Sequence, residues 1–101
     1  MSDSSQPKNV LAMIAQALAD PRRYEILKQI ASQRTPLSLA ALRKEHDIGA
    51  PTMSYHIKFL ADANLIDVKR QGTRATVALR PDILEQYVRD IERQLNLTKV
   101  A

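Results

Sequence analysis

The sequence contains no cysteine and no tryptophan, and only two of its 101 residues are glycine. Without cysteine there is no disulfide framework, no thiolate metal site and no sulfur redox switch. No apolar run approaches the roughly 20 residues of a membrane span. The polar stretch MSDSSQPKN lacks the apolar segment of a secretory signal. These absences favour one small soluble domain, which we expect to be cytoplasmic.

The charge balance is mildly basic. Fifteen Lys and Arg residues stand against eleven Asp and Glu residues, which gives a formal net charge of +4 and a pI near 9.7. The apolar share of 45% is ordinary for a folded domain. The excess of cations slightly favours a polyanionic partner, but the places where the cations lie matter more than their sum.

Apolar residues recur at helical spacing in several segments. The spacing predicts a first helix from Val10 and a second that begins where Asp20 can serve as N-cap and Pro21 as the first helical residue. Ser38 can cap a short third helix, SLAALRKEH. A fourth helix, PTMSYHIKFLADAN, follows the short connection DIGA. Its predicted inward-facing residues are Met53, Ile57 and Leu60.

The periodicity changes after Asn64. LIDVKR and RATVAL alternate apolar and polar residues on either side of the turn QGT, which predicts a β-hairpin. Pro81 then opens a last helix. The expected fold is mainly α with a β-hairpin wing, in the order α-α-α-α-β-β-α, which is a winged helix-turn-helix. Residues 1–8 are predicted to be a flexible lead-in and residues 9–97 a single domain.

A helix-turn-helix followed by a basic hairpin is suited to DNA. The second helix enters the major groove, and the hairpin reaches the neighbouring backbone or minor groove. We therefore expect residues 51–63 to be the recognition helix and residues 69–75 the wing. A charged hairpin tip alone is usually a solvated turn, so the combination of motifs carries this prediction. The predicted DNA contacts are Thr52, Ser54, Tyr55, His56, Lys58, Lys69, Arg70 and Arg74.

His56 has three possible roles. As a metal ligand it lacks partners, because His46 is the only other histidine and belongs to the other helix of the motif. It could also be a buried structural histidine, or a DNA-facing donor on the recognition helix. We predict the DNA-facing role. Phe59 is expected to pack in the core or in an interface, whereas Tyr55 is expected to face DNA.

Two phrases resemble the ArsR/SmtB family of bacterial winged-helix repressors. ALADPRRYEILKQIA is similar to the family's LADPTRRRIL-like opening of a helix, and SYHIKFLADANLIDVKRQGTRATVAL is similar to its S-x-H-L-x-x-L-x-x-A-G-L-V…R-x-G-R…Y-x-L signature. The resemblance implies a homodimer that binds a pseudo-palindromic operator and represses a nearby gene. It also implies DNA contacts at Ser54, Tyr55 and His56, and dimerisation through the first and last helices.

The sequence departs from this family at the known metal positions. Thiol-sensing members carry Cys-x-Cys where this chain has Ser38 and Ala40, and zinc-sensing members use histidine on the last helix, whereas no histidine follows His56. Carboxylates alone suit a transition metal poorly. Those on the last helix are Asp82, Glu85, Asp90 and Glu92. We predict no metal site and no cofactor. Asn64 replaces the family's glycine and can adopt the same left-handed conformation.

Surplus apolar residues on the first and last helices predict a two-fold homodimer. Pairing would bury them and set two recognition helices about one DNA turn apart, roughly 34 Å. In the alternative, both helices only close the core of one subunit. The predicted interface residues are Val10, Met13, Ile14, Ala17, Leu84, Tyr87, Val88, Ile91 and Leu95. A small effector would be expected near Met13, Tyr87 and Ile91, and control by another protein or by expression level stays open.

Two other functional classes compete with a dimeric repressor. A winged-helix module that binds a protein in place of DNA is opposed by the basic wing and by the recognition-helix pattern. An enzyme is opposed by the lack of a nucleophile–base pair, a glycine-rich phosphate loop or a metal cluster. The sequence therefore predicts a DNA-binding regulator, and salt-dependent binding to duplex DNA would distinguish it from the interaction module.

Overall fold

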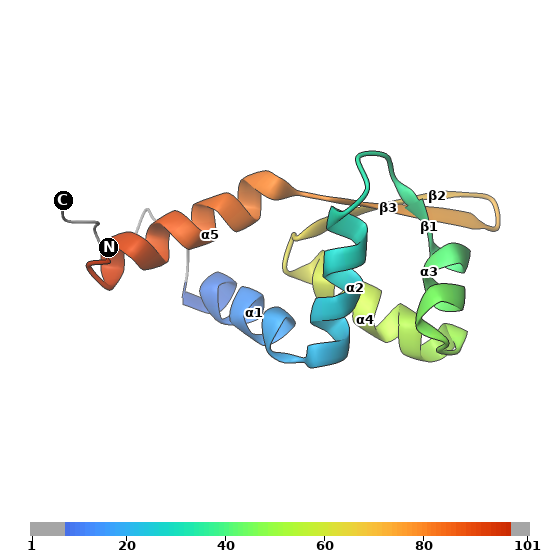
Figure 1. Ribbon diagram of the computed structural model, residues 1–101, viewed down its shortest axis with the longest axis horizontal. Coiled ribbons are helices and arrows are strands. Elements are labelled where there is room, and N and C mark those ends of the chain that lie inside the picture. Colours follow the sequence, from blue (N-terminus) through green and yellow to red (C-terminus); the bar gives the residue numbers. More distant parts are fainter. Residues whose placement is uncertain (1–7, 98–101) are drawn as a thin grey trace.

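A computed structural model describes residues 8–97, in which five helices and three strands follow one another (Figure 1). The predicted order of four helices, a hairpin and a helix is confirmed. The lead-in predicted for residues 1–8 lies outside the described residues, except that α1 begins at Lys8. None of the described helices is long and apolar enough to cross a membrane. The elements are α1 (Lys8–Ala19), α2 (Pro21–Ala31), β1 (Leu37–Ser38), α3 (Leu39–His46), α4 (Ala50–Asp62), β2 (Ile66–Gln71), β3 (Arg74–Leu79) and α5 (Pro81–Gln94).

Short polar side chains begin two of the helices. The backbone N–H of Arg23 donates to the Asp20 carboxylate at 3.1 Å, and Pro21 occupies the first turn of α2. The backbone N–H of Ala41 donates to the Ser38 hydroxyl at 3.0 Å at the start of α3. These bonds satisfy N–H groups that have no acceptor within the helix. Both predicted N-caps are confirmed.

Left-handed residues end the two helices of the helix-turn-helix. Asn64 follows α4 with φ 62°, and the next N–H, that of Leu65, donates back to the carbonyl of Leu60 at 3.0 Å. This is a Schellman ending, and it confirms the conformation predicted for Asn64. The connection between α3 and α4 turns at Asp47 with φ 52°, whereas Gly49 has an ordinary negative φ and is the N-cap of α4.

The sheet has one more strand than the sequence predicts. β2 and β3 form the expected antiparallel hairpin, with Gly72 at φ 60° in its turn, and β1 pairs with the other edge of β3 to give the order β1-β3-β2. In this register Leu37 lies opposite Val77. A strand of two residues is too short to show an alternating pattern, so no sequence signal predicts it. Because β1 leads directly into α3, the sheet ties the wing to the helix-turn-helix.

The core lies between the helix-turn-helix, α1, α2 and the inner strands. The predicted inward stripe of α4 is confirmed, since Met53, Ile57 and Leu60 are all buried. Ile14 and Ala17 of α1 are also fully buried within the single subunit. The prediction that these two residues form a dimer interface is therefore corrected, because a side chain enclosed by its own subunit cannot contact a partner. The alternative, in which α1 closes the subunit core, describes them better.

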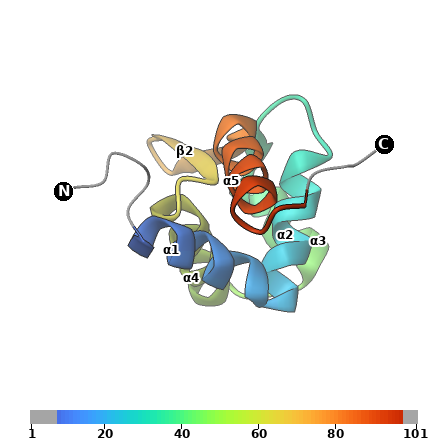
Figure 2. The ribbon, with the colours of Figure 1, turned by 90° about the vertical axis from the view of Figure 1, so that its left-hand side faces the viewer.

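α5 leaves the sheet and extends away from the wing (Figure 1), and it lies at the same end of the molecule as α1 (Figure 2). Its first turns pack on the core through Ile83, Leu84 and Tyr87. Farther along, Val88 remains 50% exposed, and Leu95, which follows the helix, remains 65% exposed. α5 therefore presents an apolar face that the described part of its own subunit leaves uncovered.

The guanidinium of Arg23 joins α1, α2 and α4. It is only 5% exposed, although it is charged. Its Nε donates to the carbonyl of Ala17 at 3.0 Å and its Nη2 to that of Gln16 at 2.9 Å, both in the last turn of α1. The same group lies 3.9 Å from the centroid of the Phe59 ring on α4. A cation at a helix C-terminus is stabilised by the carbonyls exposed there, and an aromatic face adds to this attraction.

We predict that Arg23→Met lowers the free energy of unfolding by about 2–4 kcal/mol, because the α1 carbonyls lose their donors while the apolar volume is kept. Urea denaturation followed by circular dichroism measures this. The matched control is Arg22→Met on the same helix, where an exposed arginine is replaced and we expect a change within about 0.5 kcal/mol. Equal effects of the two substitutions would contradict the role given to Arg23.

Candidate nucleic-acid interface

α4 presents a polar face to solvent. Because its apolar stripe faces the core, the side chains of Thr52, Ser54, Tyr55 and Lys58 are left exposed, as predicted. Lys58 forms an ion pair of 3.2 Å with Asp62, one turn farther along. Both partners are well exposed, so this pair contributes little to stability, and the ammonium can exchange Asp62 for a phosphate. The exposed face can therefore supply hydroxyls, a phenol and a cation to a ligand.

His56 is not on that exposed face. Its side chain is 6% exposed, and its Nδ1 lies 3.5 Å from Nη1 of Arg23. A guanidinium only donates, so Nδ1 must accept, and the ring proton of the neutral imidazole is then on Nε2. This geometry opposes the predicted DNA-facing role and matches the alternative of a structural histidine. The physical reason is the helical period, which turns position 56 toward α2 along with Ile57.

Burial lowers the pKa of the His56 imidazole below its usual value. The nearby cations Arg23 and Arg22 lower it further, and the carboxylate of Asp20 opposes them. A buried imidazolium beside a guanidinium would be a like-charge pair, which the low local dielectric penalises. His56 is therefore held in its neutral form on the buried side of α4.

Tyr55 projects from α4 and remains 59% exposed. Its ring makes edge contacts with those of Phe59, at 6.0 Å between centroids, and His56, at 5.6 Å. Phe59 packs against the core under Arg23, as its predicted packing role requires. Aromatic edges at these distances attract one another modestly. A row of rings thus supports Tyr55 while leaving much of the residue exposed.

The wing carries cations that have no carboxylate partner in the described part of the chain. Lys69, Arg70 and Arg74 are all exposed, and none takes part in an ion pair among residues 8–97. Arg80, at the end of the hairpin that faces α5, is by contrast paired with Asp67 and Asp82. Within the hairpin the unpaired positive charge is thus at the tip, where it suits a polyanion.

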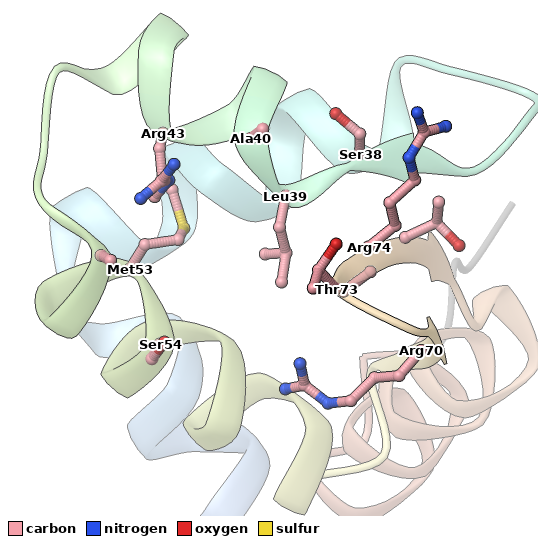
Figure 3. A pocket seen from close by; sticks show the side chains of 12 residues that line it. Ser38, Leu39, Ala40, Arg43, Met53, Ser54, Arg70, Thr73 and Arg74 are labelled. Carbon is pink, nitrogen blue, oxygen red and sulfur yellow. The ribbon is translucent and has the colours of Figure 1, made fainter.

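A hollow of about 570 Å³ separates the wing from the helix-turn-helix. In Figure 3 the Arg70 side chain extends from the wing toward α4, Arg74 lies toward Ser38, and Arg43 of α3 stands beside Met53. The sequence did not single out Arg43, because the periodicity of α3 does not tell which neighbour faces its polar side. The lining residues are Ser38, Leu39, Ala40, Arg43, Ala50, Met53, Ser54, Arg70, Thr73, Arg74, Ala75 and Thr76.

Two carboxylates of the last helix, Asp82 and Asp90, form ion pairs with arginines. Asp90 accepts hydrogen bonds from Gln86 at 2.9 Å and from Arg93 at 2.8 Å, and these bonds lower the pKa of its carboxyl. Asp82 is held in the same way by Arg80, which also lowers its pKa. Within residues 8–97 no three His, Asp or Glu side chains gather as metal ligands would. These carboxylates have structural partners.

The fold and its exposed surface define a winged helix-turn-helix protein of the DNA-binding type. A family model described as a helix-turn-helix domain matches residues 18–69. The arsenical resistance operon repressor of Bacillus subtilis is 39% identical over 57 residues, which are 56% of this chain and 53% of that protein.

Solved structures agree with this class. The crystal structure of the ArsR family transcriptional regulator RHA00566 superposes with a TM-score of 0.76 and 32% identity, over 87% of this chain and 94% of that one. The homodimeric winged helix-turn-helix DNA-binding domain of a possible ArsR-family regulator from Mycobacterium bovis superposes with a TM-score of 0.69 and 24% identity, over 87% and 84%. The chain belongs to the ArsR family of DNA-binding transcriptional regulators, and it is not an enzyme.

We predict that His56 makes stability depend on pH. The unfolded imidazole, with a pKa of about 6.5, binds a proton more readily than the folded one, so the free energy of unfolding falls as the pH drops below about 6.5. His56→Asn keeps an acceptor for Arg23 but does not titrate. The free energy of unfolding of this variant should therefore fall less than that of the wild type between about pH 7 and pH 5. Urea titrations at the two pH values measure the difference, with His46→Asn as control. Parallel losses in wild type and His56→Asn would refute this role.

Proposed function

We propose that the protein is a homodimeric repressor that binds a pseudo-palindromic operator through α4 and the wing. The observation that carries this proposal is the exposed polar face of α4 beside a wing whose cations lack carboxylate partners among residues 8–97. A helix with such a face fits the major groove, and a basic hairpin fits the adjacent backbone or minor groove. The runner-up, a protein-binding module without DNA affinity, gives no reason for this charge at the wing.

Within this proposal the exposed residues have separate tasks. Thr52, Ser54 and Tyr55 contact base edges, because their hydroxyls donate and accept hydrogen bonds without a net charge. Lys58 and the wing residues Lys69, Arg70 and Arg74 contact phosphates, which supply affinity but no sequence information. His56 does not touch DNA in this scheme. It positions the recognition helix through Arg23, and Tyr55 through ring contact.

The proposed dimer is supported by the uncovered apolar face of α5 and by the homodimeric relative from Mycobacterium bovis. Leu84, Tyr87, Val88, Ile91 and Leu95 supply this face, together with Val10 and Met13 of α1, which are only half-buried. A second copy covers the same face by two-fold symmetry. Two recognition helices then reach successive major grooves, roughly 34 Å apart.

We also propose that release from DNA does not use the metal sites known in this family. Ser38 and Ala40 stand where thiol-sensing members have cysteines, and two of the carboxylates of α5, Asp82 and Asp90, are paired with arginines. A hydroxyl and a methyl group hold no soft metal ion. Binding to the operator should therefore be the same with and without a chelator.

The direct test is fluorescence anisotropy with duplex DNA from the protein's own upstream region and with a scrambled duplex, at about 50 and 200 mM salt. We expect preferential, salt-sensitive binding to the upstream duplex, unchanged by a chelator. Failure to bind either duplex at low salt would favour the protein-binding module. Tighter binding on addition of a chelator, as expected where a bound metal releases the protein from DNA, would restore the metal-sensing alternative.

Arg74→Ala separates phosphate contact from base contact in the wing. We predict weaker binding to both duplexes and a salt slope, log Kd against log salt, that falls by about one unit, because one phosphate contact is lost. Tyr55→Ala is the comparison, since it removes a proposed base contact without changing charge. It should weaken binding to the upstream duplex far more than to the scrambled one. Loss confined to the upstream duplex in Arg74→Ala would mean that the wing contacts bases.

Val88→Glu tests the dimer. We predict that the dimer dissociation constant rises about tenfold or more, because a carboxylate replaces an apolar contact. Sedimentation velocity over a range of concentrations measures it, and circular dichroism checks that the half-exposed site tolerates the change. Tyr24→Glu on α2 is the control, since it also places a carboxylate at an exposed apolar residue. Dissociation by both variants, or by neither, would contradict an α5 interface.

A further inference from the structure

The hollow between α3, α4 and the wing has charged groups of one sign only. Arg43 comes from α3, whereas Arg70 and Arg74 come from β2 and β3, and no carboxylate is among the lining residues. None of these arginines takes part in an ion pair within residues 8–97. Cations around one space repel each other unless an anion neutralises them. Because all three arginines line the same hollow, the hollow is suited to an anionic ligand.

Neutral donors lie beside these cations. Ser38, Ser54, Thr73 and Thr76 place hydroxyls along the lining. The Ser38 oxygen already accepts the N–H of Ala41 as the cap of α3, so its own proton is left to donate. Ala50, at the first turn of α4, also lines the hollow, and Gly49 supplies no side-chain cap there. The uncapped N–H groups and the helix dipole add positive potential on that side.

The hollow is larger than a bare anion requires. Its volume of about 570 Å³ is of the size that ligand sites have, about 300–1,000 Å³. Leu39, Ala50 and Ala75 contribute apolar surface between the polar groups. A phosphodiester with its adjoining sugars combines a compact charge with apolar ring faces, so it matches this mixed lining better than a small inorganic ion does.

We infer that this hollow receives one segment of the sugar–phosphate backbone of bound DNA, and that Arg43 is a phosphate ligand supplied by α3. The inference rests on the proposed DNA-binding function and adds a site that neither α4 nor the wing forms alone. A guanidinium can hold a phosphate through two parallel hydrogen bonds, which a lysine ammonium cannot. A backbone segment held there touches α3, α4 and both wing strands, and so fixes the wing relative to the recognition helix.

The first test compares Arg43→Ala with Lys44→Ala. Both remove one positive charge from α3, but only Arg43 lines the hollow. We expect Arg43→Ala to weaken binding to upstream and scrambled duplexes by about tenfold or more and to lower the salt slope by about one unit. Lys44→Ala should have a smaller effect, and Arg43→Lys should restore only part of the affinity. Thermal unfolding checks that the substitutions at the half-exposed Arg43 do not destabilise the fold.

The second test identifies the phosphate. Duplexes that carry one neutral methylphosphonate linkage at successive positions are titrated with wild type and with Arg43→Ala. We expect one position where the neutral linkage weakens wild-type binding about tenfold but weakens Arg43→Ala binding hardly at all. Equal losses at every position for the two proteins would overturn the assignment, even though the protein still bound DNA.

Free oxyanions have the same chemistry as a backbone phosphate, so a third arm distinguishes them. Without DNA, the melting temperature is measured in inorganic phosphate and in chloride at equal ionic strength. Stabilisation by phosphate that Arg43→Ala abolishes, without coupling to any methylphosphonate position, would assign the hollow to a free anion and overturn its assignment to DNA. Failure of wild type to bind any duplex would instead overturn the proposed function itself.

Discussion

One buried cation connects the helices that carry the proposed DNA-binding surface. Arg23 lies where the end of α1, the first turn of α2 and the middle of α4 meet, and its guanidinium contacts the carbonyls of α1 and the rings of His56 and Phe59. A planar group with five donors can serve these partners at once, whereas a lysine ammonium has a single charged end. The recognition helix is therefore held by a side chain of another helix as well as by its own apolar stripe.

One face of α4 packs in the core and the other faces solvent. At the inward positions of α4, Met53, Ile57 and Leu60 fill the core and His56 contacts Arg23. The outward positions are therefore free to contact a ligand. The sheet extends this division, because β1 and β2 both pair with β3 and carry the wing cations beside the start of α4. Recognition helix and wing thus form one surface, supported by one core.

Local signals in the sequence predicted local structure well. Asp20 and Ser38 cap their helices, and Asn64 ends α4 with a positive φ, because each of these depends on the backbone within a few residues. The same reasoning erred on His56, which a sequence pattern places beside Tyr55 but which the helix turns inward. It gave no indication of Arg43 as part of the site, since its partners come from a hairpin about thirty residues later.

The sequence by itself determined the order of the elements, the helix ends, the basic turn and the family, because periodicity, capping and short motifs act over neighbouring residues. Only the tertiary structure decided which polar side chains face solvent and which face each other. In the structure His56 lies against Arg23, Ile14 and Ala17 lie inside the subunit, and Arg43 lines the same hollow as the wing arginines. The reason is that these outcomes depend on packing between segments far apart in the chain, which no local pattern encodes.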